Sequence, residues 1–131
     1  MIAIDSSALI AILRCEPEAD RFIRVIAAAD RRILSAVSLL ETSMVLAGRT
    51  GDLRAWTGLD ALMARASIEV VSQDAEQAML ARKAFLVFGK GRHPAALNLG
   101  DCAAYALARS RAVPLLFKGE DFARTDLLPV S

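Results

Sequence analysis

Four acidic residues stand where the chain passes from one predicted element to the next. Asp5 follows the first apolar run, and Glu41 lies in the first turn of a predicted helix. Asp101 opens an alanine-rich run, and Asp121 lies in a polar turn after the last long apolar run. Carboxylates gathered in one place can hold a hard divalent cation or exchange protons with water. Their chemistry therefore depends on whether the fold brings them together.

A length argument places Asp101 and Asp121 at the same end of a sheet. A helix over residues 101–111 would be about 16 Å long at 1.5 Å per residue. A strand over residues 113–117 that runs back covers about the same distance at 3.3 Å per residue. The helix runs one way and the strand returns, so the two carboxylates finish side by side at one end.

The rest of the chain alternates predicted strands with predicted helices. Such alternation predicts an α/β layer structure with a mostly parallel sheet. Ligands bind at the carboxyl ends of the strands in such sheets, so the four acids are predicted to share one rim. We predict strands over residues 1–4, 33–36, 68–71 and 113–117 and an edge strand over 127–130, with helices after residue 7 and over 17–29, from 38 to a break at 49–51, 52–66, 72–88 and 101–111.

Composition predicts one cytoplasmic domain over residues 1–131. The hydrophobic content of 55% supports a substantial core, and the net charge of +1 by itself neither favours nor excludes an anionic partner. Cys15 and Cys102 lack metal-ligand spacing, which favours a reduced compartment. The first residues do not have the pattern of a signal peptide. No apolar run reaches the roughly 18 residues that a membrane span needs, so no membrane association is expected.

Each acid also has a structural interpretation. Asp5 and Asp101 can be helix N-caps, because Asp is among the preferred residues there. The spacing Ser38-x-x-Glu41 fits a capping box, and Asp121 can end a turn. Taken singly, these interpretations are favoured. Four like charges at one sheet edge repel one another, however, and a divalent cation removes that repulsion.

The ligand types indicate which cation and which reaction. Oxygen ligands without histidine or cysteine favour Mg²⁺ or Mn²⁺ over Zn²⁺. The single histidine, His93, lies in a polar loop and supports no catalytic triad. A carboxylate-bound Mg²⁺ commonly serves phosphate chemistry. Lys118 and the Lys90–Arg92 loop can hold phosphates, although ordinary surface charge explains each of them about as well.

Five segments together resemble the PIN-domain toxins of the VapC family. The resemblance extends from the first residue to the Thr125-Asp126-Leu127 tail, and the order and spacing of the segments make it specific. The segments read IAIDSSAL (2–9), LLE (39–41), GKGRHP (89–94), LNLGDC (97–102) and LFKGEDF (116–122).

The resemblance implies a PIN-like three-layer fold and a Mg²⁺- or Mn²⁺-dependent endoribonuclease, the toxin of a type II toxin–antitoxin pair. It further implies a homodimer whose site is blocked by a cognate VapB-like antitoxin. The family's acids carry over onto Asp5, Glu41, Asp101 and Asp121, with Asp5 and Asp101 as the metal ligands. Ser6 matches a hydroxyl residue that orients the first acid. Asp121 is preferred to its acidic neighbours Glu120 and Asp126 because it precedes an aromatic residue as in the family motif.

Two other classes of protein stay open on the residues alone. A phospho-acceptor receiver domain is also a small α/β fold with an acidic Mg²⁺ pocket. It needs adjacent acids after the first strand, whereas this chain has Asp5-Ser6-Ser7. A non-catalytic binding module would use the acids only as helix caps. The presence of all four acids at the matched positions argues against that second alternative.

Overall fold

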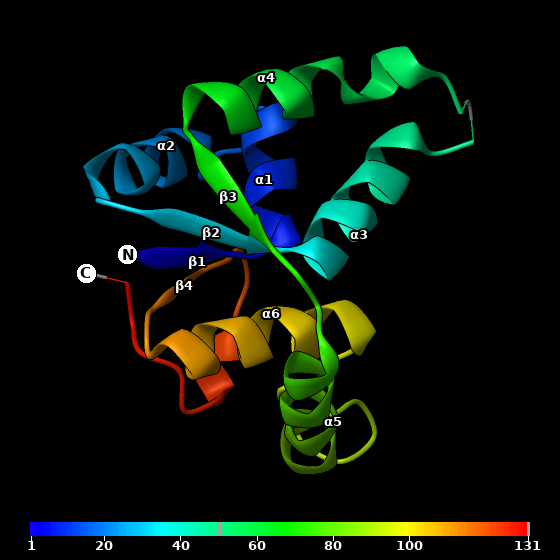
Figure 1. The fold of residues 1–131 in the computed structure, drawn as a ribbon, viewed down its shortest axis with the longest axis vertical. Coiled ribbons are helices and arrows are strands. Elements are labelled where there is room, and N and C mark those ends of the chain that lie inside the picture. The colour runs from blue at the N-terminus through cyan, green and yellow to red at the C-terminus, as the bar shows by residue number, and fades with distance from the viewer. Residues whose placement is uncertain (50, 131) are drawn as a thin grey trace.

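Four short parallel strands form the centre of the computed structural model, which describes residues 1–49 and 51–130 (Figure 1). They are β1 (Ile2–Ile4), β2 (Arg32–Ser35), β3 (Ile68–Val71) and β4 (Leu115–Leu116), in the sheet order β3-β2-β1-β4. Every neighbouring pair is parallel, which confirms the predicted sheet. Thr50, in the predicted helix break, and Ser131 lie outside the described residues.

Helices cover both faces of this sheet (Figure 1). The chain forms α1 (Ser6–Leu13), α2 (Ala19–Ala28), α3 (Ala36–Ala47), α4 (Thr57–Arg65), α5 (Ala75–Phe88) and α6 (Leu99–Arg111), with the 3₁₀ turns η1 (Leu53–Trp56) and η2 (Phe122–Arg124). α5 and α6 lie on one face, and α1, α2 and α4 lie on the other. The predicted three-layer α/β architecture is therefore confirmed. No helix in the described ranges is long and apolar enough to cross a bilayer.

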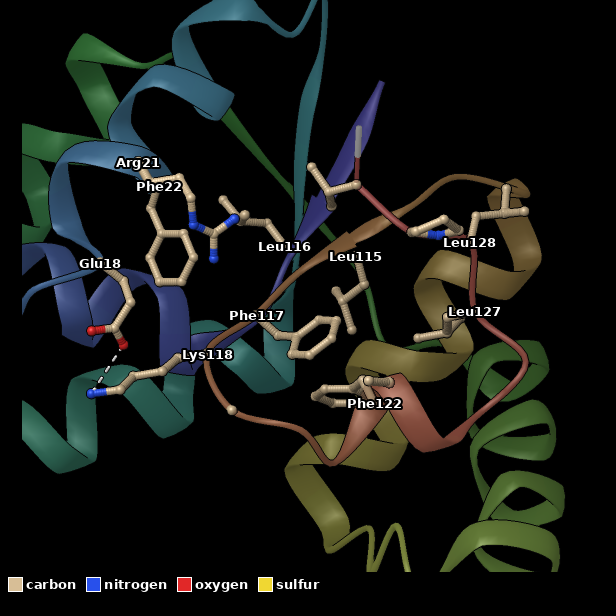
Figure 2. A pocket seen from close by; sticks show the side chains of 14 residues that line it. Glu18, Arg21, Phe22, Leu115, Leu116, Phe117, Lys118, Phe122, Leu127 and Leu128 are labelled. Carbon is tan, nitrogen blue, oxygen red and sulfur yellow. Dashed lines mark ion pairs between the residues drawn. The ribbon is translucent and has the colours of Figure 1, made fainter.

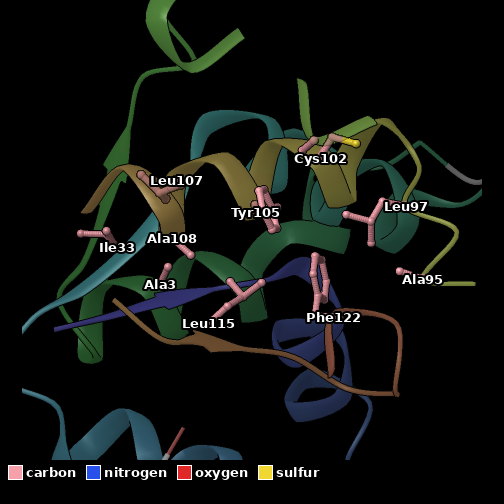
Figure 3. Packing of buried hydrophobic residues seen from close by; sticks show 12 residues of the cluster. Ala3, Ile33, Ala95, Leu97, Cys102, Tyr105, Leu107, Ala108, Leu115 and Phe122 are labelled. Atoms are coloured by element: carbon pink, nitrogen blue, oxygen red, sulfur yellow. The ribbon is translucent and has the colours of Figure 1, made fainter. Parts of the chain in front are cut away.

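Alternate residues of each strand supply two separate cores. Ile2 and Ile4 point to the face covered by α1, α2 and α4, whereas Ala3 points to the face covered by α5 and α6. Because side chains alternate along a strand, a strand buried on both faces is apolar throughout. The second core, shown in Figure 3, is built from Ala3, Ile33, Leu115 and small or aromatic residues of α6, including Ala104, Tyr105 and Ala108.

The strand register brings three carboxyl ends to the same level. Ala3 of β1 pairs with Ile33 of β2 and with Leu115 of β4. α6 precedes β4 and crosses the sheet in the opposite sense, so its first turn lies at that same end. The length argument for Asp101 and Asp121 therefore holds. The loops after β1 and β4, the helix after β2 and the start of α6 meet at one rim.

The predicted edge strand over residues 127–130 is wrong. Within the described part of the chain the sheet ends at β4, and residues 127–130 contain no strand. Asp126 accepts a hydrogen bond from the Tyr105 hydroxyl and lies 3.7 Å from the Arg109 guanidinium. These contacts hold the tail to α6. Pro129 cannot donate to a strand ladder, so the tail gains little from pairing with β4.

Three of the helices that begin away from the predicted residues have an N-cap side chain that explains where they begin. α3 begins at Ala36 and α5 at Ala75, where the predictions were residues 38 and 72. α6 begins at Leu99, where the prediction was residue 101. In each case the residue before the helix accepts a hydrogen bond from a backbone N–H of the first turn. These N-caps are Ser35, Asp74 and Asn98.

Candidate active site

Asp5 presents one satisfied oxygen and one free oxygen. It is the N-cap of α1, as one structural interpretation predicted, and only 2% of it is exposed. Its Oδ2 accepts hydrogen bonds from the Ser7 backbone N–H at 3.0 Å and from the Ser7 hydroxyl at 2.6 Å. Its Oδ1 is buried and has no hydrogen-bond partner among the described residues. Capping explains Oδ2 but leaves Oδ1 as an unused acceptor, which costs free energy unless a ligand satisfies it.

The two serines after Asp5 orient different acids. Ser7, not Ser6, donates to Asp5. The Ser6 hydroxyl donates to Glu41 Oε1 at 2.6 Å. The prediction that Ser6 orients the first acid therefore needs correction, because the helical turn after Asp5 directs the Ser6 side chain towards α3. Both hydroxyls still donate hydrogen bonds to carboxylates among the four predicted acids.

Glu41 is positioned by tertiary contacts and not by a capping box. The N-cap of α3 is Ser35, so Ser38 lies inside the helix and the predicted Ser38–Glu41 box is wrong. The Glu41 carboxylate lies against Gly100 in the first turn of α6. A Cβ atom added at Gly100 would lie 2.3 Å from Glu41 Oε2. Only glycine leaves room for the carboxylate in this place.

Asp101 belongs to the capping box that the chain does contain. Its backbone N–H donates to Asn98 Oδ1 at 2.9 Å, and its Oδ2 accepts from the Asn98 backbone N–H at 3.0 Å. Asn98 is the N-cap of α6, so the interpretation of Asp101 as the cap itself is wrong. The box holds the Asp101 side chain at the start of the helix, where the macrodipole favours negative charge.

The charges of the four acids act on one another. Burial raises the pKa of Asp5 to about 7; hydrogen bonds from Ser7 oppose this rise, and the charges of Asp101 and Glu41 add to it. Burial also raises the pKa of Asp101, and the charges of Glu41 and Asp121 raise it further. The sequence predicted that acids gathered at one edge of the sheet would repel one another, and partial desolvation of the site strengthens this repulsion.

Asp121 is the residue of its acidic segment whose charge acts on the cluster. It stands at the start of η2 and is exposed. Glu120 lies 3.7 Å from Arg124, and Asp126 is held by Tyr105 and Arg109. Of these three acids, only Asp121 contributes charge to Asp101.

The residues fit a divalent cation in donor chemistry. Within residues 1–49 and 51–130, no three acidic, histidine or cysteine side chains stand in a formed ligand shell. The acids that interact are all oxygen donors, the type that hard cations prefer. Asp5 Oδ1 is a buried acceptor without a protein donor in the described ranges, so a positive ligand would remove its desolvation cost.

The three predicted basic residues lie in two different settings. Lys90 and Arg92 are exposed in the loop between α5 and α6, where the Arg92 guanidinium lies 5.6 Å from the Phe85 ring centroid. Lys118 follows β4 and does not have a free ammonium. Its Nζ lies 2.7 Å from Glu16 Oε1 and 3.3 Å from Glu18 Oε2.

A cavity of about 510 Å³ lies beside the acid cluster without including it. Figure 2 shows it between β4, the start of α2 and the C-terminal tail. Its walls are mainly apolar, with Phe22, Phe117 and Phe122 among them, and Lys118 stands at its edge. The four acids lie outside its lining, so this cavity and the acid cluster are separate features.

Comparison with known proteins finds relatives over nearly the whole chain. The PIN domain family model matches residues 2–128. Ribonuclease VapC30 of Mycobacterium tuberculosis is 45% identical over 130 residues, which cover 99% of this chain and 98% of that protein. Ribonuclease VapC of Mycolicibacterium smegmatis is 46% identical over 129 residues, which cover 98% of this chain and 99% of that protein.

Solved structures show the same fold at low identity. The crystal structure of Mycobacterium tuberculosis VapC20, described as a sarcin-ricin loop cleaving toxin, matches with a TM-score of 0.74 and 23% identity over 99% of this chain and 98% of that one. VapBC2 from Rickettsia felis, bound to a DNA fragment from its promoter, matches with a TM-score of 0.76 and 14% identity over 100% of this chain and 98% of that one.

The fold, with acids at the carboxyl edge of its parallel sheet, and the family match over residues 2–128 define the class. The chain belongs to the PIN-domain family. Its relatives over nearly the whole length are VapC ribonucleases, so this PIN domain is a ribonuclease of the VapC toxin type. The predicted family is confirmed, and the receiver-domain and binding-module alternatives are set aside.

Proposed function

We propose that the chain hydrolyses RNA phosphodiester bonds at the cluster of Asp5, Glu41, Asp101 and Asp121, with Mg²⁺ or Mn²⁺ as the cofactor. The observation that carries this proposal is the Asp5 carboxylate. One of its oxygens is saturated by Ser7, and the other is buried without a partner in the described structure, beside two further acids. Asp5 and Asp101 would hold the cation. Such a cation lowers the pKa of water and neutralises charge on the phosphodiester.

Side chains of the protein position the acids and transfer the proton. The Ser7 hydroxyl and backbone N–H keep Asp5 in one rotamer, and Ser6 keeps Glu41 beside α6. Glu41 would take a proton from the attacking water while the water oxygen bonds to phosphorus. The bond from phosphorus to the leaving sugar oxygen breaks, and that oxygen takes a proton from solvent. Asp121 is the exposed member of the cluster, so it would meet the incoming substrate first.

The substrate backbone has cationic groups available near the start of α6. Lys90 and Arg92 are exposed on the loop that leads into that helix. Lysine and arginine side chains that neutralise phosphates supply most non-specific affinity for nucleic acid. We therefore propose Lys90 and Arg92 as phosphate contacts. The sequence also predicts Lys118 as a phosphate contact, but there an RNA phosphate would compete with Glu16 and Glu18 for the ammonium.

We further propose that residues 1–131 form a single catalytic domain that acts in the cytoplasm and is restrained by a VapB-like antitoxin. Solved structures of the same fold include the toxin–antitoxin complex from Klebsiella pneumoniae, with a TM-score of 0.71 and 18% identity. That likeness shows the fold. The inferred antitoxin is the partner expected of a VapC ribonuclease.

The proposed homodimer has a candidate surface on α3 and the start of α6. Leu40, Met44 and Leu99 are 60%, 65% and 79% exposed, and two adjoining apolar hollows share Val37 and Leu99. An apolar patch of this kind commonly marks an interface between proteins. Met44→Glu should lower the sedimentation mass of the purified chain to that of one copy, whereas Leu53→Glu, an exposed leucine of η1, should not. A wild-type chain that sediments as one copy would contradict the dimer.

Cleavage of RNA with and without EDTA tests the proposed reaction. We expect activity with Mg²⁺ or Mn²⁺ and none in EDTA. Asp101→Asn and Glu41→Gln should fold normally, because Asn can keep the capping box and Gln can accept from Ser6. Each should lose a factor of about 10² or more in rate, the scale of a lost acid–base group. Asp60→Asn, in an exposed acid of α4, is the matched control. Full activity in EDTA would eliminate the mechanism.

A further inference from the structure

Lys118 joins three segments that are distant in sequence. Its ammonium contacts Glu16 at 2.7 Å and Glu18 at 3.3 Å, in the connection between α1 and α2. Its backbone N–H donates to Ser7 Oγ at 3.0 Å in the first turn of α1. Lys118 itself lies in the loop that leads from β4 to Asp121. Figure 2 shows its side chain extended towards Glu18 at the edge of the cavity.

The backbone contact determines how Ser7 meets Asp5. A serine hydroxyl has one proton to donate, and it can accept other hydrogen bonds. Because Ser7 Oγ accepts from the Lys118 N–H, its own proton is directed to Asp5 Oδ2, 2.6 Å away. The Ser7 backbone N–H donates to the same oxygen at 3.0 Å. Asp5 Oδ2 is thus saturated, and Oδ1 is the oxygen left to bind a cation.

The side-chain contacts hold the residue that makes this backbone contact. The loop after Lys118 turns through Gly119, whose φ of +95° is in the left-handed region. The connection before Glu16 turns through Cys15, whose φ is +52°. Two sharply turned loops are joined across their ends by the ion pairs of Lys118. The Lys118 side chain is 40% exposed and those of Glu16 and Glu18 are 26% and 29% exposed, so water screens the ion pairs only in part.

We propose that Lys118 is a positioning residue. The Glu16–Lys118–Glu18 clamp holds the loop after β4 in place. Through the Lys118 N–H and Ser7, it keeps Asp5 Oδ1 available to the cation. This inference rests on the proposed function of the acid cluster. It gives Lys118 a role different from the phosphate contact that the sequence predicts.

The two roles of Lys118 make opposite predictions for the glutamates. If Lys118 binds an RNA phosphate, Glu16 and Glu18 compete with the substrate, and their removal should lower KM. If the clamp positions Asp5, removal of the glutamates should produce the same defect as removal of the ammonium. A phosphate contact also contributes to the salt dependence of binding, with a slope of about 0.7 per contact for single strands. A positioning residue contributes none.

The experiment compares Lys118→Met with the double variant Glu16→Gln/Glu18→Gln in the full chain. The matched controls are Lys83→Met, an exposed lysine of α5, and Glu69→Gln. The second control breaks the exposed pair between Glu69 of β3 and Arg31, which precedes β2. The measurements are kcat, KM for one RNA at several salt concentrations, and Mn²⁺ affinity by electron paramagnetic resonance titration.

We expect both test variants to bind Mn²⁺ about tenfold more weakly, the lower end of what outer-shell partners of a metal site contribute. Their kcat should fall to a similar extent, with KM and its salt slope unchanged. Lys118→Arg keeps both ion pairs and should retain nearly wild-type values. A higher KM with a shallower slope for Lys118→Met, or a lower KM for the double variant, would overturn the inference. Unchanged Mn²⁺ affinity in both would also overturn it.

Asp5→Asn separates this inference from the proposed function. If Asp5→Asn cleaves RNA at the wild-type rate, the acid site itself is wrong. If Asp5→Asn is inactive while Lys118→Met matches its control, only the positioning role is wrong. Should Lys118→Met not fold, the double glutamate variant decides, because it leaves the lysine in place.

Discussion

A single hydrogen atom at position 100 controls where the Glu41 carboxylate lies. A Cβ atom at that position would stand 2.3 to 2.6 Å from the three carboxyl atoms of Glu41. These atoms are the end of a flexible side chain, which can move aside at little cost. Gly100→Ala should therefore leave the fold intact while moving the carboxylate away from its place beside Ser6 and α6.

The expected result for Gly100→Ala is a stable but impaired enzyme. Alanine in place of glycine in a helix contributes up to about 1 kcal/mol of stability, so the melting temperature should hold or rise. Cleavage should fall by about 10², since misplacement of a catalytic group by about 1 Å has effects of that size. Gly58→Ala in α4 is the control, because an added Cβ there meets only Leu13 at 3.4 Å. Normal cleavage by Gly100→Ala would mean that the position of Glu41 does not matter.

At the scale of the element, α6 supplies part of the core and one of the proposed catalytic acids. Its buried small residues pack against the sheet, and its first turn carries Asp101. The capping box couples the two functions, because Asn98 satisfies a backbone N–H of the helix and fixes Asp101 Oδ2. The start of this helix is therefore part of the proposed active site.

Asn98→Ala should weaken the helix start and disturb Asp101 together. Loss of an N-cap side chain costs about 1 kcal/mol, which predicts a lower urea midpoint. The cleavage rate should fall less than in Asp101→Asn, since the carboxylate stays and the Asn98 backbone N–H still reaches it. Asn98→Ser keeps a capping oxygen and should restore both values. Equal stability of the alanine and serine variants would show that the box contributes nothing.

At the scale of the whole molecule, the buried acid makes folding stability depend on pH. In the unfolded chain Asp5 loses its proton near 3.8, whereas in the folded chain its pKa is about 7. Between these values the folded state holds a proton that the unfolded state has lost. The contribution of Asp5 to stability is therefore greatest below about pH 4, falls as the pH rises to about 7, and stays low above that.

Urea unfolding at pH 5 and pH 8 tests this linkage in metal-free protein. We expect the wild type to be less stable at pH 8, by on the order of a few kcal/mol. Asp5→Asn should show a smaller difference, because it removes the titrating group. Added Mg²⁺ should stabilise the wild type more at pH 8 than at pH 5, since it binds the ionised carboxylate. Identical pH profiles for wild type and Asp5→Asn would refute the assignment of this group.

Much of the architecture follows from local patterns. The short apolar runs predicted the four strands, because strands buried on both faces show unbroken hydrophobic residues. The spacing of Asp101 and Asp121 predicted their shared end from helix and strand lengths alone. The predicted segment 127–130 failed because an apolar run with proline does not show whether a neighbouring strand or a helix will hold it. In the structure, the contacts of Asp126 with Tyr105 and Arg109 hold this segment to α6.

The sequence by itself determined the family and the parallel α/β fold, and it proposed the four acids as a set, since these depend on residue types and their spacing along the chain. Only the tertiary structure decided which atoms meet. Ser7, and not Ser6, donates a hydrogen bond to Asp5. Gly100 leaves space for the Glu41 carboxylate. Lys118 forms ion pairs with Glu16 and Glu18. The physical reason is distance. A hydrogen bond or ion pair joins atoms about 3 Å apart. Its two partners can lie far apart along the chain, and their positions in the sequence do not show that they are in contact.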